Sequence, residues 1–95
     1  MHDWTLESVT MDWESGNTLF KLRRFGDGAD VELTCFSVIN LTIPRVQDWG
    51  PSVFILDCEE PVKTESGVRL CMEMQTGDMI EVEARSIVCE VLGWI

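Results

Sequence analysis

The side chains of this 95-residue chain that could do chemistry are mainly carboxylates. Glu81 and Glu83 share one face of a predicted strand, so they could flank a sugar or bind Ca²⁺. Alternating acids are also typical of a solvated strand face, and we favour that interpretation. An enzyme that acts on a sugar or a small polar substrate through Glu81 and Glu83 is therefore kept as an alternative.

Other reactive groups are sparse. The single histidine, His2, lies at the second residue, and a mobile chain end is a poor place for a general base. The sequence contains no nucleophile elbow, phosphate-binding loop or dinucleotide fingerprint. The widely spaced cysteines, without a Cys-x-x-Cys pair, disfavour zinc; they are Cys35, Cys58, Cys71 and Cys89. We therefore expect no catalytic residue, no metal and no cofactor.

The charge of the chain limits its partners. Seventeen acids against seven bases give a formal net charge of −10. The negative field repels phosphate backbones and anionic lipid head groups, so we expect no binding to nucleic acid or to a membrane. The same field speeds the encounter with a basic protein, which is therefore the favoured partner. Lys21, Arg23 and Arg24 are the only basic cluster, and we expect them to pair with neighbouring acids. No stretch approaches the ~20 apolar residues of a membrane span.

The segment from Asp48 to Pro51 is the candidate contact site. Tryptophan is enriched among binding hot spots, and Gly50-Pro51 would hold Trp49 rigidly, which lowers the entropy lost on binding. The alternative is that Trp49 plugs an open end of the core. The predicted partner-binding surface joins this loop with nearby acids and comprises Asp48, Trp49, Asp57, Glu59 and Glu60.

The elements that position these residues are strands. Apolar and polar residues alternate on both sides of Gln75-Thr76-Gly77, which predicts a β-hairpin with Gly77 in the left-handed conformation. A one-residue slip would turn apolar side chains outward, so the register is well specified. The predicted pairs are Met72 with Ile80, Leu70 with Val82, and Arg69 with Glu83.

A second hairpin is predicted around Glu14–Asn17, which is a turn signal. A four-residue loop there would pair Trp13 with Thr18, Met11 with Phe20 and Val9 with Leu22. Trp4 and Leu6 are out of phase with this set, and a bulge near Glu7–Ser8 would correct the phase.

The remaining segments also favour strands. Val31–Phe36 and Ser37–Ile43 alternate, while the short apolar run Ser52–Leu56 is typical of a strand buried on both faces. Residues 86–95 fit helix or strand, and we prefer strand because Ile and Val dominate. Cys35 and Cys89 are expected to be small core residues. The sequence thus predicts a single all-β domain over residues 1–95, an antiparallel sandwich or rolled sheet of seven to eight short strands.

Five short motifs stand out along the chain: His2-Asp3-Trp4, Asp12–Gly16, Ile43-Pro44-Arg45, Trp49–Ser52 and Met74–Asp78. Together they resemble a group of small bacterial proteins without an assigned activity. More loosely, the layout is similar to small β-rich immunity proteins of bacterial toxin systems. That resemblance implies an acidic inhibitor that blocks a basic toxin, and it implies no particular site residue.

The resulting hypothesis is a non-catalytic protein-binding module, immunity- or inhibitor-like, for a basic partner. The alternative outside enzymes is a homo-oligomer or assembly subunit that uses exposed sheet edges. The first residues lack the basic start and apolar run of a secretion signal, so we expect a cytoplasmic protein with free thiols.

Overall fold

The computed structural model describes residues 3–44 and 54–92, and its seven strands form one antiparallel sheet. The strands are β1 (Thr5–Asp12), β2 (Asn17–Arg23), β3 (Asp30–Thr42), β4 (Ile55–Cys58), β5 (Val62–Lys63), β6 (Val68–Met74) and β7 (Met79–Val91). Their order is β1-β2-β3-β7-β6-β4, and β5 pairs with β6. The predicted all-β antiparallel fold is confirmed. The described residues contain no helix long and apolar enough to cross a membrane.

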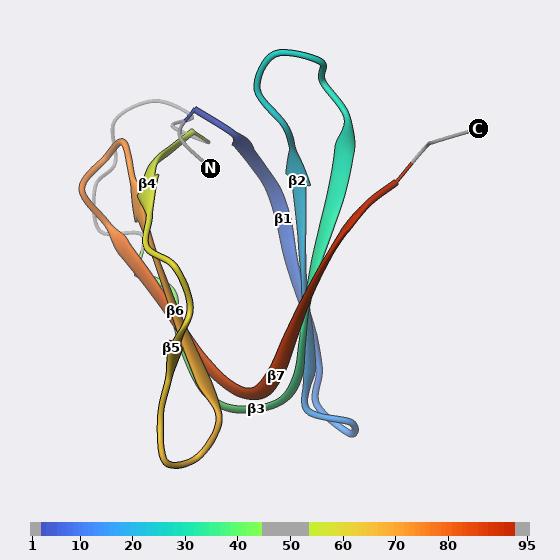
Figure 1. Cartoon of the computed structure of the whole chain (residues 1–95), viewed down its shortest axis with the longest axis vertical. Helices are drawn as coiled ribbons and strands as arrows, with labels where there is room; N and C mark the ends of the chain where they lie inside the picture. The colour runs from blue at the N-terminus through green and yellow to red at the C-terminus, as the bar shows by residue number, and fades with distance from the viewer. Residues whose placement is uncertain (1–2, 45–53, 93–95) are drawn as a thin grey trace.

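The sheet is folded into a V by its two longest strands, β3 and β7, of 13 residues each (Figure 1). We call the half with β1, β2, the start of β3 and the end of β7 the first wing. The second wing holds the end of β3, the start of β7, β4, β5 and β6. At the bend, Ser37 has a φ of 54° and the register shifts between Val38 and Asn40. The two segments predicted on either side of Ser37 are therefore one continuous strand.

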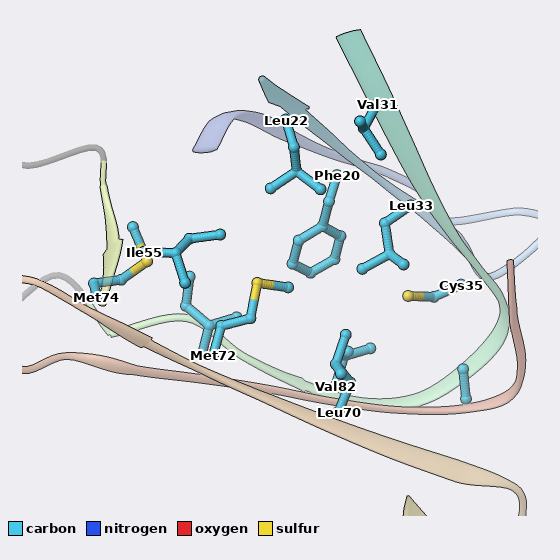
Figure 2. Packing of buried hydrophobic residues seen from close by; sticks show 12 residues of the cluster. Phe20, Leu22, Val31, Leu33, Cys35, Ile55, Leu70, Met72, Met74 and Val82 are labelled. Atoms are coloured by element: carbon cyan, nitrogen blue, oxygen red, sulfur yellow. The ribbon is translucent and has the colours of Figure 1, made fainter. Parts of the chain in front are cut away.

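The core lies between the two wings. Figure 2 shows Phe20 and Leu33 of the first wing directed toward Met72 and Val82 of the second, and these side chains are almost completely buried. Burying each such side chain contributes about 1.5–3 kcal/mol to the free energy of folding. Because side chains alternate between the two faces of a strand, all of these core residues come from one face of the sheet. At one end the sheet edges meet, because Ile55 N–H donates to Trp4 O at 2.9 Å.

The late hairpin has the predicted register. Arg69 lies opposite Glu83, Leu70 opposite Val82 and Met72 opposite Ile80. Gly77 has a φ of 94°, as the three-residue loop requires. The predicted bulge in the first strand is also confirmed, since the register of β1 shifts between Leu6 and Ser8.

The first hairpin has a four-residue loop as predicted, but the loop starts one residue earlier, so the pairing is shifted by two residues. Met11 lies opposite Thr18 and Val9 opposite Phe20, so the loop begins at Trp13. The reason is that Asp12 closes the turn, both by its carbonyl, which accepts from Gly16 N–H, and by its carboxylate.

Two expectations about burial are wrong. The run around Ile55 was expected to be buried on both faces, but Phe54 and Leu56 are exposed because the described strands form a single sheet and no second layer of described residues covers its outer face. Cys35 is in the core as expected, whereas Cys89 is exposed because the end of β7 lies at the other edge of the first wing. The preference for strand after residue 86 is confirmed as far as Val91.

Candidate functional site

The structure places part of the predicted partner-binding surface on an exposed edge of the second wing. Asp57 lies in β4, and Glu59 and Glu60 follow it directly; all three are exposed. Asp48 and Trp49 lie outside the described residues. The question of whether Trp49 is a core plug or an exposed anchor therefore stays a prediction.

The same face carries further carboxylates from neighbouring strands. Leu70 and Met72 of β6 point into the core, as do Ile80 and Val82 of β7, so the residues between them project outward. Asp57 lies opposite Glu73, and Cys71 lies between Glu81 and the segment of Glu59, whose N–H donates to Cys71 O. We call this outer surface the acidic face; it comprises Asp57, Glu59, Glu73, Glu81 and Glu83.

Few positive charges balance the acidic face. Among the described residues, Arg69 is the one base paired with this face, and its Nε lies 3.9 Å from Glu81 Oε1 with both side chains about half exposed. Such an exposed pair contributes little, ~0–1 kcal/mol. Within residues 54–92, Asp57, Glu59 and Glu73 make no ion pair. Asp57 and Glu73 oppose each other directly, an arrangement of like charges that destabilises a sheet.

The thiol of Cys71 reports this negative environment. Partial burial raises its pKa, and the carboxylates of Glu81 and Glu59 raise the pKa further, against an opposite effect of Arg69. The thiol is therefore kept neutral, because an anion there would face carboxylates on two sides. Cys71 is a poor nucleophile in this position.

Glu81 and Glu83, the pair considered for catalysis, are both on the outer face and partly exposed. Glu83 accepts a hydrogen bond of 2.6 Å from Thr64 Oγ1, while Glu81 is beside Arg69. Across the described residues, no cluster of three or more His, Cys, Asp or Glu side chains has an arrangement that could hold a metal ion.

Trp13 is an exposed aromatic residue that the sequence analysis placed in a strand. Its side chain is 86% exposed at the tip of the β1–β2 hairpin. The turn is held by Gly16 N–H to Asp12 O at 2.9 Å and by Val38 N–H to Gly16 O at 2.7 Å. An exposed tryptophan on a turn held in this way is a candidate hot spot. The feature of the sequence that could have predicted this exposure is Asp12, because its side chain favours a turn that begins one residue before the predicted loop.

The basic cluster is paired as predicted for its two arginines. Arg23 Nη2 lies 2.6 Å from Glu7 Oε2, and Arg24 binds both carboxylate oxygens of Asp27. The second pair is local to the β2–β3 turn, where Ala29 N–H also donates to Asp27. These arginines therefore pair with acids of the first wing and are not available to the acidic face of the second wing.

Comparisons with known proteins inform the fold. No protein-family model matches the chain, and no curated protein matches it. The crystal structure of an uncharacterized protein from Neisseria gonorrhoeae is similar, with a TM-score of 0.72 and 16% identity over 97% of this chain and 94% of that one. The match covers nearly the whole of both chains, so this chain shares its overall fold with the Neisseria protein.

Proposed function

We propose that this protein is a non-catalytic binding module of the cytoplasm that docks a basic protein partner through the acidic face. The observation that carries the proposal is the set of five outward carboxylates, of which Glu81 alone is ion-paired among the described residues, with Arg69. All four cysteines are free, which supports a reducing compartment. An inhibitor of a basic toxin, as the resemblance to immunity proteins implies, fits this description.

The acidic face is suited to binding because it is already organised. Four of its five carboxylates stand on paired strands whose opposite face is the buried core, and Glu59 directly follows β4, so their backbone positions are set before a partner arrives. Lysine or arginine side chains of a partner would relieve the repulsion between Asp57 and Glu73. Complementary charge also raises the association rate, most strongly at low salt.

Charge alone does not give a tight complex. Exposed ion pairs contribute ~0.2–1 kcal/mol each, so five carboxylates supply about 1–5 kcal/mol. A micromolar complex needs about 8 kcal/mol, and the rest must come from apolar contacts. The predicted anchor for those contacts is Trp49.

The test is capture of partners from native lysate at low salt with two matched variants. The double variant Asp57→Asn/Glu73→Gln removes an opposed pair of acids from the acidic face. The control Glu32→Gln/Glu90→Gln removes the opposed pair of acids on the outer face of the first wing. Both variants change the net charge equally, so only the position of the charge differs.

We expect basic proteins to be captured by the wild type and by the control, and to be lost with the acidic-face variant. Equal loss with both variants would show that net charge alone attracts the captured proteins, and the proposed surface would be wrong. Recovery of chaperones alone would also contradict the proposal. Trp49→Ala tests the anchor separately, since unchanged capture would exclude that residue from the surface.

A further inference from the structure

The last part of β7 is a sheet edge. On its β6 side, pairing ends where Ala84 meets Val68. From Ile87 to Val91 the strand is hydrogen-bonded to β3 alone, through pairs such as Leu33 with Cys89. Among the described residues, no strand pairs with the other side of this segment.

The directions of its backbone groups follow from one hydrogen bond. Leu92 N–H donates to Asp30 O at 2.7 Å, so the amide and carbonyl of Leu92 point toward β3. Because successive residues of a strand alternate in this direction, those of Val88 and Glu90 also point toward β3. The N–H and C=O groups of Ile87, Cys89 and Val91 therefore point away from the sheet.

This edge lacks the features that normally block pairing. Natural edges carry bulges, prolines or several charges. The β1 edge has the bulge at Leu6–Ser8, the end of β3 has an irregularity at Val38–Asn40, and the β4–β5 side carries acids and a proline. From residue 86 to residue 92 the only charged side chain is Glu90, and Val88 is 41% exposed.

We propose that Ile87–Val91 pairs in antiparallel fashion with the same segment of a second copy of this chain. A twofold axis perpendicular to the sheet keeps inner and outer faces continuous across the junction. With the axis at Cys89, Ile87 of each copy lies opposite Val91 of the other. All three outward residues then exchange their backbone hydrogen bonds.

This register also avoids like charges. Val88 of each copy lies opposite Glu90 of the other, so the two glutamates do not meet. An axis at Glu90 would oppose the two carboxylates, which destabilises a strand pair. Cys89 lies opposite its own copy at the axis, at the Cα separation of about 5.5 Å that is typical of a hydrogen-bonded pair.

The first experiment measures the dimer dissociation constant by light scattering and sedimentation, with circular dichroism as the control for folding. Val88→Glu places carboxylates opposite each other and is expected to raise the dimer Kd about tenfold or more. Val88→Lys places an ammonium opposite Glu90 and is expected to lower the Kd. A monomer at all concentrations, or a change in the same direction for both variants, would overturn the proposal.

The salt dependence separates this dimer from the basic-partner complex. Two copies that each carry a charge of −10 repel, so added salt is expected to strengthen the dimer by screening. The proposed basic-partner complex is expected to weaken under the same change. A dimer that dissociates as salt rises would contradict pairing between these edges.

The second experiment fixes the position of the axis. A short bis-maleimide is expected to link two chains through Cys89, which is exposed. The covalent dimer is expected to persist in Cys71→Ser and to vanish in Cys89→Ser. A cross-link that follows Cys71, or no cross-link under conditions where light scattering shows a dimer, would exclude this register.

Discussion

Gly67 is a position where an added side chain would clash with the backbone of another strand. A Cβ at this position would lie 2.1 Å from Ala84 O and 2.9 Å from Arg85 Cα, at the bend of β7. The loop before β6 is closed by Thr64 N–H, which donates to Gly67 O at 2.8 Å. Neither backbone can therefore move independently of the hairpin. We expect Gly67→Ala to destabilise the fold strongly.

The size of the effect has two parts. A φ of +155° is a conformation that L side chains rarely adopt, and such strain costs about 1–3 kcal/mol. Carbon and oxygen normally approach to about 3.3 Å, so β7 must shift by roughly 1 Å, and overpacking of this kind costs about 1–3 kcal/mol. The expected loss of about 2–6 kcal/mol is a large part of the total stability of about 5–14 kcal/mol for a domain of this length.

Gly77→Ala is the matched control. Gly77 also has a positive φ, +94°, but nothing lies within 4 Å of a Cβ built there. It therefore loses only the conformational part. Urea unfolding followed by circular dichroism is expected to give a free energy of unfolding about 1–3 kcal/mol lower for Gly67→Ala than for Gly77→Ala. Equal losses, or a smaller loss at Gly67, would refute the close approach of the two backbones.

Three further predictions concern buried or paired groups. The hydroxyl of Thr18 is buried without a hydrogen-bond partner in the described structure, so Thr18→Val is expected to raise the free energy of unfolding by about 1–3 kcal/mol in urea unfolding; a loss would contradict this. The hydrogen bond from Arg24 and that from Ala29 N–H lower the pKa of Asp27 from 3.8 to about 2, so its stabilising effect is present above pH 3.8 and is lost as the pH falls through 2. An NMR titration is expected to give that midpoint, and an unchanged midpoint in Arg24→Met would exclude the pair as its cause. Burial raises the pKa of the Cys35 thiol to about 11, so a thiol reagent at pH 8 is expected to modify the exposed Cys89 first; similar rates would show that Cys35 is accessible.

The late hairpin could be predicted in detail because its signals are local. Alternation on both sides of Gly77 fixes which side chains share a face, and the loop length fixes the register. The first hairpin was predicted with the wrong loop because two adjacent turns satisfy the same alternation. The choice between them depends on Asp12 and on the contact of Gly16 O with Val38, a residue of another strand.

The site was only partly predictable for the same reason. Asp57, Glu59 and Glu60 were identified from charge, but the chain does not show that Glu73 lies opposite Asp57 or that Glu81 lies near Glu59. The exposure of Trp13 depended on where the hairpin turns. The exposure of Phe54 and Leu56 follows from the single-layer sheet, whose outer face no other described element covers, and the apolar sequence does not reveal this.

The two-residue period and the turn residues determined by themselves that this chain folds into antiparallel strands with one apolar and one charged face. The amino-acid composition determined the net charge of −10. Only the tertiary structure decided that β7 lies between β3 and β6, that both long strands bend, and that the end of β7 has a free edge. Pairing between distant strands depends on which arrangement closes the core between the wings. The free energy gained by closing the core comes from residues of all the strands together, so no single segment of the sequence determines it.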